Sequence, residues 1–527
     1  MGGPELLLLM LTLAVGGLSV LAGAVRVPYP IVLVLGGLAL GFVPGMPPAE
    51  LPPDLVLVLF LPPLLFQEAF SFSPRELRAN AGVITLLAVG LVLATMTAVA
   101  AVAHALVSGL PWAAAFTLGA IVSPTDPLAA TAILRRLGVP RRLVTVLEGE
   151  SLVNDATALV AYRLAVAAVV AGSFSLWQAG LEFVTGAVGG VAIGLAVGWL
   201  IAEALRRIQD PVTQIVLSVV TGYAAYLPAD RLGLSGVLAA VAAGLYAGWR
   251  APQLGSPAGR LLGVSFWEVL VYLLNAVLFV LVGLQLHPIL NELLPDPATV
   301  RIGHAALVSA VVIAVRIGWW FTVPYLIRTL DRRPAQRARR ASPGERLVAG
   351  WSGMRGAVSL AAALALPLTT STGQPFPHRH LIIFLTFGVI LATLVGQGLS
   401  LPWLIRRLGL QRDDSETQEE LRGRLRTTDV ALARLEELAA EEWTRDDTVE
   451  RMRGLYQLRR RRLKARDGSL ADDGTEDRSL AYQRLVRELL EAQHREIVLL
   501  RNQGQISNEV MRRIEHDLDL EDSRLEP

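Results

Sequence analysis

Long runs of apolar residues, separated by short polar breaks, occupy the chain up to about residue 405. Most of these runs approach or exceed roughly 18 residues, the length that a helix needs to cross a bilayer. The pattern predicts about thirteen spans, at residues 5–24, 29–45, 51–67, 80–107, 112–134, 142–171, 176–204, 211–227, 233–248, 264–287, 300–327, 345–367 and 379–405. We therefore expect an all-α polytopic membrane protein.

Arginine is distributed unevenly between the predicted loops. The loops after odd-numbered spans carry most of it: Arg26; Arg75 and Arg78; Arg135, Arg136, Arg141 and Arg142; Arg206 and Arg207; Arg250 and Arg260; and the bases of 328–346. The loops after even-numbered spans carry Arg231, Arg301 and Arg379. Because basic residues accumulate in cytoplasmic loops, this pattern predicts an N-terminus outside the cell and a C-terminal tail in the cytoplasm.

The composition changes after residue 405. Hydrophobic residues make up 53% of the whole chain and charged residues 18%, but acids and bases alternate densely in the last part. The shift divides the chain into a transmembrane domain, 1–405, and a helical cytoplasmic tail, 406–527, with a polar break at 467–477. The arginines lie beside predicted spans, which indicates topology rather than nucleic-acid binding. The chain has no cysteine, so disulfides, thiolate metal sites and cysteine nucleophiles are excluded.

Two predicted spans are interrupted at matching positions. The fifth span contains Pro124 and Pro127, and the twelfth carries three glycines around Arg355. If spans 1–6 and 8–13 are two halves of opposite orientation, these are the fifth spans of each half. Matched interruptions are typical of transporters built as an inverted repeat with broken crossing helices at the substrate site. The alternative is that membrane helices often contain Gly and Pro in any case.

The first interruption carries a charge. Asp126 is the single formally charged side chain between Arg78 and Arg135. An ionisable group inside a membrane is expensive, which makes it a functional-site hypothesis by default. The prolines free backbone carbonyls that can ligate a cation, and Thr125 stands between them. The simpler alternative is a proline kink in which Asp126 caps a helix, and the two roles are compatible.

A second polar group follows on the next span. Ser151 and Asp155 are four residues apart and share one helix face, while Glu150 and Asn154 form the adjacent stripe. Oxygen ligands suit hard cations, so we predict that Asp155, Ser151 and Thr125 hold Na⁺, with Asp126 and Asn154 in the same ion and proton site. A proton and Na⁺ then compete for the Asp155 carboxylate. With Asn154 rather than a second acid beside it, exchange of one proton per cation, an electroneutral process, is predicted.

Further charges lie in apolar stretches. Glu150 and Arg355 are each too costly to bury alone, and we expect them to form a structural ion pair between the two halves. Arg316 and Arg163 have no assigned partner, and Arg316 is a further candidate for the site. Glu68 ends the third span, where it either reaches the cavity or is an interfacial acid.

Four segments together resemble a known family. Ser123-Pro124-Thr125-Asp126-Pro127, GESLVNDA at 149–156, FWEVLVYLLNAVLFVLVGLQL at 266–286 and GMRGAVSLAAALALP at 353–367 are similar to the Na⁺/H⁺ exchangers of the NhaP/NHE type, in family order. The tail from about 478 also resembles the tails of bacterial members. The resemblance implies a thirteen-span inverted-repeat fold in the bacterial inner membrane, a homodimer, and a core domain that moves against a dimerisation domain.

The same resemblance implies roles for individual residues. It makes Asp155 the shared Na⁺/H⁺ carboxylate, places Ser151, Thr125 and Asp126 in the ion site, and pairs Glu150 with Arg355. The acid on the family's third span has only an approximate match in Gln67-Glu68.

Two other classes of membrane protein, an intramembrane serine protease and a cation channel, share single features with this sequence. Gly233-Leu-Ser235-Gly236 has the form seen in intramembrane serine proteases, with His304 on the same predicted side, although small residues at a helix-packing face explain it as well. A cation channel would also place acids in a pore, but channel filters usually come from symmetric re-entrant loops. We expect a transporter rather than an enzyme, with no cofactor, whose partners are monovalent cations, protons and the bilayer. Na⁺ is the predicted cation and K⁺ the alternative.

Overall fold

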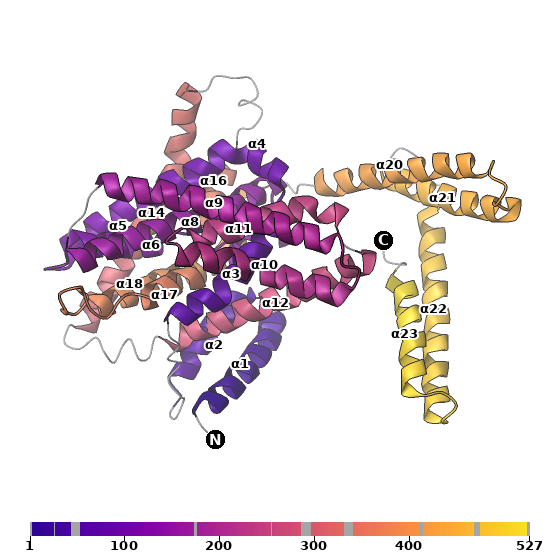
Figure 1. The fold of residues 1–527 in the computed structure, drawn as a ribbon, viewed down its shortest axis with the longest axis horizontal. Helices are drawn as coiled ribbons and strands as arrows, with labels where there is room; N and C mark the ends of the chain where they lie inside the picture. Colours follow the sequence, from indigo (N-terminus) through magenta and orange to yellow (C-terminus); the bar gives the residue numbers. More distant parts are fainter. Residues whose placement is uncertain are drawn as a thin grey trace. The chain divides into compact units, whose positions relative to one another are not determined.

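The computed structural model describes residues 3–25, 27–43, 53–172, 176–254, 256–285, 297–330, 341–410, 415–467 and 475–523. These residues are helical, apart from turns and one isolated bridge between Thr369 and Pro375 (Figure 1). The chain divides into two compact units, Met1–Arg412 and Asp413–Pro527. The predicted boundary after residue 405 falls inside the last helix of the first unit, so the division comes later than the composition indicates.

The first unit contains the apolar helices. They are α1 (Gly3–Val25), α2 (Tyr29–Gly41), α3 (Pro53–Ser71), α4 (Pro74–Thr85), the π-helix η1 (Leu86–Leu91), α5 (Val92–Leu106), α6 (Trp112–Val122), α7 (Leu128–Arg136), α8 (Arg141–Ala171), α9 (Leu176–Leu205), α10 (Pro211–Arg231), α11 (Gly236–Arg250), the short 3₁₀-helix η2 (Ala251–Gln253), α12 (Pro257–Leu284), α14 (Ala298–Leu330), α16 (Pro343–Trp351), α17 (Ala357–Leu364), α18 (Arg379–Leu391), the π-helix η3 (Ala392–Gln397) and α19 (Gly398–Leu408).

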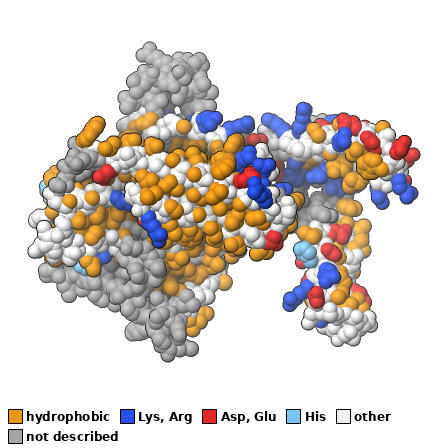
Figure 2. Space-filling view, in the orientation of Figure 1, with side chains coloured by type: hydrophobic (Ala, Val, Ile, Leu, Met, Phe, Trp, Pro, Cys, Tyr) orange, Lys and Arg blue, Asp and Glu red, His pale blue; other side chains and the backbone are white. Residues whose placement is uncertain are grey.

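Several of these helices have the dimensions of membrane spans. Within the described residues, seven helical stretches are long and apolar enough to cross a bilayer, and two of these, Pro74–Leu106 and Arg379–Leu408, run through a π-helix. Parts of α1 and α3, together with α2 and α6, form shorter apolar helices. Their outer faces are apolar as well: Figure 2 shows hydrophobic side chains spread over this unit, and Val188, Leu195 and Trp199 of α9 are exposed. A contiguous apolar surface of this kind is the signature of a surface in contact with lipid. The first unit is therefore a multi-pass membrane domain.

The helices of this domain pack as two bundles. In the first bundle α11 lies against α3, α9 and α10, and α12 lies against α2. In the second bundle α6 lies between α5 and α8, and α14 packs on α5, α16 and α18. Contacts between the bundles come mainly from α17 and α8, which meet α3, α11 and α12. The candidate site lies along this boundary.

Small residues allow the closest approaches within the first bundle. Gly37 of α2 and Gly283 of α12 face each other across a backbone contact, since a Cβ added at Gly283 would lie 2.3 Å from the carbonyl oxygen of Val34. Gly194 of α9 meets the carbonyl of Ala239 in α11 in the same way. Helices in a membrane gain most of their association energy from such close packing, because lipid offers no hydrophobic driving force.

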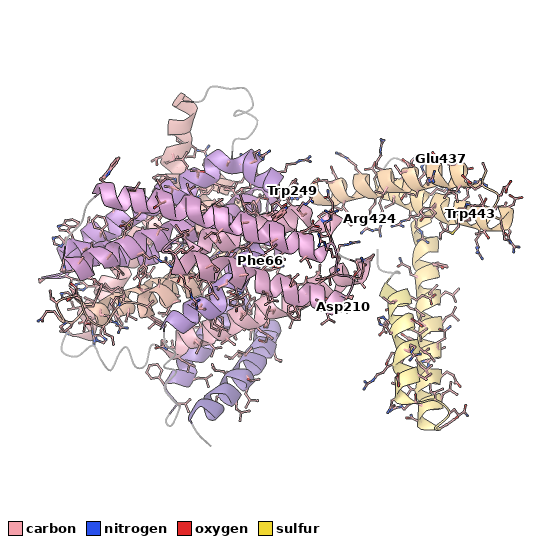
Figure 3. The ribbon with its side chains drawn as sticks, in the orientation of Figure 1. Phe66, Asp210, Trp249, Arg424, Glu437 and Trp443 are labelled. Atoms are coloured by element: carbon pink, nitrogen blue, oxygen red, sulfur yellow. The ribbon has the colours of Figure 1, made fainter. Side chains whose placement is uncertain are left out.

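The second unit is a helical tail, as predicted. It contains α20 (Ser415–Leu438), α21 (Asp446–Arg466), α22 (Thr475–Asn502) and α23 (Asn508–Ser523), with α20 packed on α21 and α22 on α23. Arg453 donates two hydrogen bonds of 2.7 Å to Glu436 and so ties α21 to α20. Trp443, labelled in Figure 3, lies in the turn between α20 and α21 and is exposed.

Some predicted features lie outside the described residues. They are Arg26 and 331–340 in two of the basic loops, and 468–474 in the polar break of the tail.

The α2–α12 contact gives a stability test with an internal control. We expect Gly283→Ala to lower the free energy of unfolding by about 1–3 kcal/mol, because the methyl group overpacks a backbone contact. Gly263→Ala, on the same helix with open space around it, should be neutral or slightly stabilising. Thermal unfolding of both purified variants in detergent measures the difference, and equal melting temperatures would contradict this account of the packing.

Candidate functional site

Both predicted interruptions are present. Helix α6 ends at Val122 and α7 begins at Leu128, with non-helical backbone between them. Helix α16 ends at Trp351 and α17 begins at Ala357, with non-helical backbone at 353–356 that is extended at Gly356. Pro124 and Pro127 supply no backbone donor in the first break, and glycines surround Arg355 in the second. Each break leaves two half-helix ends inside the membrane domain.

The two breaks contact each other directly. The backbone N–H of Asp126 donates to the carbonyl of Met354 at 2.8 Å. In return, Nε of Arg355 donates to the carbonyl of Val122 at 3.0 Å. Backbone groups without water must find partners in the protein, and here each break satisfies the other. The crossing therefore holds the half-helix ends in place.

Asp126 lies at the start of two helices. Its Oδ1 accepts a 3.0 Å hydrogen bond from the N–H of Leu128 at the beginning of α7. On its other side it packs against Gly356, the residue that precedes α17, where an added Cβ would lie 1.7 Å from Oδ2. A carboxylate is favoured by the positive end of a helix dipole, and Asp126 faces two of them. The predicted cap is observed, and the same side chain also lines a cavity.

Helix α8 is held against the first break by three side chains. Ser151 donates from Oγ to the carbonyl of Thr125 at 2.9 Å, and Asn154 donates from Nδ2 to the Thr125 hydroxyl at 2.9 Å. That hydroxyl donates in turn to Oε1 of Glu150 at 3.3 Å. These bonds fix the register of α8, so that Asp155 lies one turn beyond Ser151 on the same face, buried but in contact with the cavity.

A cavity of about 620 Å³ lies beside the crossing, on the boundary between the bundles. Four of the predicted residues line it, namely Thr125, Asp126, Ser151 and Asp155. Asn154 does not line the cavity; it lies behind Thr125, and its Oδ1 is buried without a hydrogen-bond partner. Four of the five residues predicted for ion binding therefore share one cavity, and Asn154 supports Thr125 from behind.

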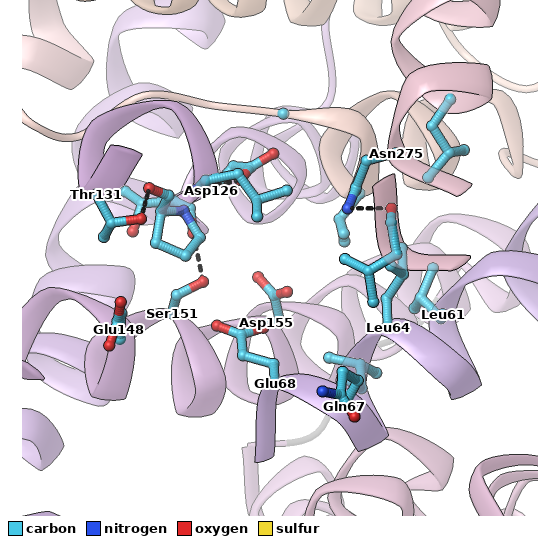
Figure 4. Close-up of a pocket in the computed structure, with 18 of the residues that line it drawn as sticks. Leu61, Leu64, Gln67, Glu68, Asp126, Thr131, Glu148, Ser151, Asp155 and Asn275 are labelled. Carbon is cyan, nitrogen blue, oxygen red and sulfur yellow. Dashed lines mark hydrogen bonds between the residues drawn. The ribbon is translucent and has the colours of Figure 1, made fainter. Parts of the chain in front are cut away.

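Glu68 belongs to the same cavity. It comes from α3 of the first bundle, and Figure 4 shows its carboxyl group in the same space as that of Asp155, opposite Asp126. Of the two alternatives for this residue, the structure shows the position in the cavity wall. The carboxyl groups of three acids therefore converge from both bundles.

The predicted ion pair between Glu150 and Arg355 is wrong, because Glu150 pairs with Arg316 instead. Arg316 extends from α14, and its NH1 and NH2 both donate to the Glu150 carboxylate, the latter at 2.9 Å. Each side chain is only 1% exposed. A bidentate arginine–carboxylate pair is the strongest form of such a contact, and removing one partner of a buried pair typically costs about 3–5 kcal/mol.

Arg355 is satisfied by backbone instead. Besides the Val122 carbonyl, it donates to the carbonyl of Gly353, and its own N–H donates to Oγ1 of Thr393 at 3.1 Å. The carbonyl end of α6 is the negative end of a helix dipole, which favours a guanidinium. Arg355 thus compensates the negative partial charge of carbonyls at a half-helix end. The Glu150 carboxylate pairs with Arg316 instead.

Several residues of the cavity were assigned no role from the sequence, although three of them lie in the family-like segment 266–286. Tyr29, Trp267, Tyr272 and Asn275 line it, and the rings of Tyr29 and Tyr272 contact each other at a centroid distance of 4.7 Å. Aromatic residues in an apolar span look the same whether they face lipid, a helix or a cavity. An acid and a base near its rim, Glu148 and Arg135, form a 2.7 Å ion pair.

Ser235, the serine of the alternative protease interpretation, lies at the start of a helix. Ser235 precedes α11, and its Oγ accepts a 3.2 Å hydrogen bond from the N–H of Leu238, which is an N-cap. Helix α11 packs in the first bundle, whereas His304 lies on α14 in the second. The Gly-Leu-Ser-Gly segment is thus explained by capping and packing.

The geometry defines a class of protein. Interrupted helices that cross beside a cavity, with acids and hydroxyl and carbonyl oxygens in its wall, are typical of ion-coupled secondary transporters. Such oxygens suit hard cations, and the carboxyl groups also exchange protons.

Comparison with known proteins identifies the family. The family model for the transmembrane region of sodium/hydrogen exchangers matches residues 10–407. The chain belongs to the sodium/hydrogen exchanger family and is a cation:proton antiporter of the NhaP type.

Individual relatives cover most of the chain. It is 38% identical over 511 residues to the uncharacterized Na⁺/H⁺ exchanger Rv2287 of Mycobacterium tuberculosis, which spans 96% of this chain and 93% of that protein. It is 36% identical to a sodium, potassium, lithium and rubidium/H⁺ antiporter of Bacillus subtilis, over 72% of this chain and 58% of that one. The solved structure of MjNhaP1 from Methanocaldococcus jannaschii has the same fold, with a TM-score of 0.58 at 20% identity, over 77% of this chain and 99% of that chain.

A double-mutant cycle tests the corrected ion pair. Arg316→Met should lower the free energy of unfolding by about 3–5 kcal/mol, because the Glu150 carboxylate is left buried and unpaired. Glu150→Gln in the same chain should recover part of that loss, giving a coupling energy of about 0.5–3 kcal/mol. Thermal unfolding of the purified variants provides the measurement.

The matching cycle of Glu150→Gln with Arg355→Met is the control, since the guanidinium of Arg355 donates to backbone carbonyls, whereas the Glu150 carboxylate accepts from Arg316. A larger coupling to Arg355 than to Arg316 would show that the sequence-based pairing was right after all.

Proposed function

We propose that the protein exchanges one monovalent cation for one proton across the membrane, with Asp155 as the carboxylate that binds either ion. The observation that carries this proposal is the position of Asp155 beside the crossed breaks, one turn from Ser151 and next to Thr125 and Asp126. A deprotonated Asp155 with these oxygens can coordinate a small cation, while a protonated Asp155 needs none. Either ligand neutralises the site.

The stoichiometry follows from which bundle holds each charge. Asp126 and Asp155 belong to the second bundle, and Asp126 faces two helix N-termini that compensate its charge. Glu68 belongs to the first bundle, so it stays behind when one bundle moves against the other. The net charge of the moving site is then set by Asp155 alone, and a single cation or a single proton balances it. We infer electroneutral one-for-one exchange.

Sodium is the proposed cation, with potassium as the alternative for the same site. The relative from Bacillus subtilis is named for sodium, potassium, lithium and rubidium, and oxygen ligands around one carboxylate suit all of these ions. The exact cavity dimensions around Asp155 decide between them. No resident cofactor is proposed, because the transported ions themselves complete the site.

The topology is part of the same proposal. We infer thirteen spans related by an inverted repeat, with the N-terminus outside, the tail in the cytoplasm of a bacterial cell, and a homodimer formed through the first bundle. The crossing of α6–α7 with α16–α17 supports the repeat, because each break supplies the partner of the other. In this topology the cavity rim at Arg135 and Glu148 faces the cytoplasm.

An ion pair at the opposite end of α8 closes the outer side. Arg163 of α8 donates to the carboxylate of Asp230 at the end of α10, and its NH1 donates to the carbonyl of Leu234 at 3.4 Å. This bridge joins the second bundle to the first. If the bundles move against each other to expose the site to the outside, the Arg163–Asp230 bridge must break first.

Transport is tested in everted membrane vesicles with an imposed acid-inside pH gradient, followed by a ΔpH dye. Addition of Na⁺ should dissipate the gradient with wild-type protein and not with Asp155→Asn, because an amide cannot exchange a proton for a cation. Asp210→Asn, an exposed helix cap that asparagine can replace, is the matched control. Cation-driven dissipation by Asp155→Asn at the wild-type rate would overturn the assignment of Asp155.

Two further measurements in the same vesicles test which cation is exchanged and whether the exchange is electroneutral. Replacing Na⁺ by K⁺ or Li⁺ identifies the cation. A membrane potential imposed with a potassium ionophore should leave the initial rate of Na⁺-driven exchange unchanged if exchange is electroneutral, and a rate that follows the potential would contradict it.

The outer bridge is tested with thiol chemistry, for which the cysteine-free chain is well suited. In the double variant Arg163→Cys/Asp230→Cys, a short bifunctional thiol reagent should abolish exchange, because a covalent cross-link between α8 and α10 prevents the two bundles from separating. Tyr223→Cys/Leu59→Cys is the control, since Tyr223 donates to the carbonyl of Leu59 within the first bundle. Full exchange by the cross-linked Arg163/Asp230 pair would show that the bundles do not separate there.

A further inference from the structure

A second cavity, of about 690 Å³, lies where four helix ends of the membrane domain meet. Its wall comes from the end of α1, the start of α2, the end of α7 and the last turns of α19. The lining residues include Val27, Tyr29, Ile133, Arg136, Leu137 and Arg406. None of the residues that we assign to ion binding belongs to it.

Helix α7 separates this cavity from the ion site. Leu128, Thr131 and Arg135 line the ion cavity, and Ala132 and Arg136 line the second one. The two sets recur at helical spacing on different faces of the same short helix. Tyr29 lines both cavities, so its ring is a shared wall. Whatever fills the second cavity therefore contacts the helix that begins directly after Asp126 and Pro127.

The lining combines positive charge with apolar surface. Arg136 and Arg406 stand at the ends of α7 and α19, and the wall between them is formed by aliphatic side chains such as Val27, Ile133 and Leu137. The Nε of Arg406 donates to the carbonyl of Pro402 at 3.1 Å, which holds that side chain along the last turn of α19. No acidic residue is among the lining residues that the structure describes. The cavity is thus complementary to an anion that carries hydrocarbon.

A neighbouring pair of residues fits the same environment. Trp403 is exposed on α19, and the guanidinium of Arg407 lies over its ring, 5.9 Å from the centroid. Exposed tryptophan beside arginine is typical of the headgroup level of a membrane, where the indole is half in lipid and half in water. The mouth of the cavity therefore lies at headgroup depth.

We propose that this cavity binds an anionic phospholipid of the cytoplasmic leaflet, with its phosphate between Arg136 and Arg406 and an acyl chain along the aliphatic wall. Basic pockets between helices on the cytoplasmic side suit such headgroups. A soluble phosphate would use the two arginines but leave the apolar wall uncovered, so the lining favours the lipid over free phosphate.

The lipid would act on transport through α7, an effect that rests on the proposed function. Helices α1 and α2 belong to the first bundle, whereas α7 and α19 pack with the second. A lipid wedged between them favours whichever arrangement of the bundles keeps this cavity open. Anionic lipid thus stabilises the conformation described here. It raises the population of this conformation relative to the one in which the ion site opens to the outside.

Lipid binding is measured first, without transport. A failure of the lipid site can then be distinguished from a failure of the proposed exchange function. Purified full-length protein in a neutral detergent is titrated with phosphatidylglycerol, and the rise in its melting temperature gives the apparent affinity. Arg136→Gln and Arg406→Gln should each weaken binding by about fivefold, and the double variant by about twenty-five-fold, as expected for two arginines near one phosphate. Arg207→Gln, an exposed arginine beside another predicted cytoplasmic loop, is the matched control and should bind as the wild type does.

The probes distinguish the sources of the phosphate. Phosphatidylcholine should give a much smaller rise, and glycerol-3-phosphate, which has the headgroup chemistry without acyl chains, should give none. A rise with glycerol-3-phosphate equal to that with the lipid would replace the lipid by a soluble phosphate ligand. Equal phosphatidylglycerol binding by the double variant and the wild type would overturn the site altogether.

Transport is then compared in proteoliposomes with and without phosphatidylglycerol. The exchange rate of the wild type should depend on the anionic lipid, and that of the double variant Arg136→Gln/Arg406→Gln should not. Both the wild type and the double variant should retain Na⁺-driven exchange. Loss of all exchange in both proteins would count against the proposed function and leave the binding result standing.

Discussion

The structure depends on one interaction, the mutual satisfaction of two broken helices inside a membrane. Every backbone group freed by a break must find a partner without water, and each break would be too costly alone. The N–H of Asp126 and the carbonyl of Met354 close one side of the crossing, and Arg355 with the carbonyl of Val122 closes the other. The cavity, the acids and the direction of α7 all follow from this arrangement.

The crossing also explains how charge is tolerated at this depth. Asp126 stands at the positive ends of two helices and Arg355 at the negative end of a third, so neither requires a side-chain counter-ion. The Glu150–Arg316 pair, by contrast, is a direct contact between α8 and α14. Fixed dipoles and one ion pair together compensate these buried charges, and this is why we propose that a mobile ion balances the charge of Asp155.

The sequence predicted the helical class, both interruptions and most of the candidate site, because membranes restrict the possibilities so strongly. A charge in an apolar run has to be functional or paired, and prolines have to break a helix. Glu68 could not be placed from the sequence, since its position at a span end fits both a cavity and an interface. The structure resolves this through the packing of α3 on the second bundle.

The wrong ion pair has an instructive cause. Arg316 and Arg355 both lie in apolar stretches, and composition alone does not say which of them meets Glu150. The prediction considered side chains as partners and left out carbonyls at a helix end, which turned out to satisfy Arg355. Cavity-lining aromatic residues such as Tyr29 were missed for a related reason: a hydropathy pattern records how apolar a residue is and not what it faces.

The buried pair between α8 and α14 has a consequence for kinetics. It makes the second bundle a rigid body, since α8 carries Ser151 and Asp155 while α14 holds α5, α16 and α18. If this bundle moves as one body, as we propose, the geometry around a bound ion stays the same throughout the movement. In the proposed mechanism ion affinity and transport rate are then separable: the polar groups at the crossing would set the affinity, and the interface of α17 with α3 and α12 would set the rate.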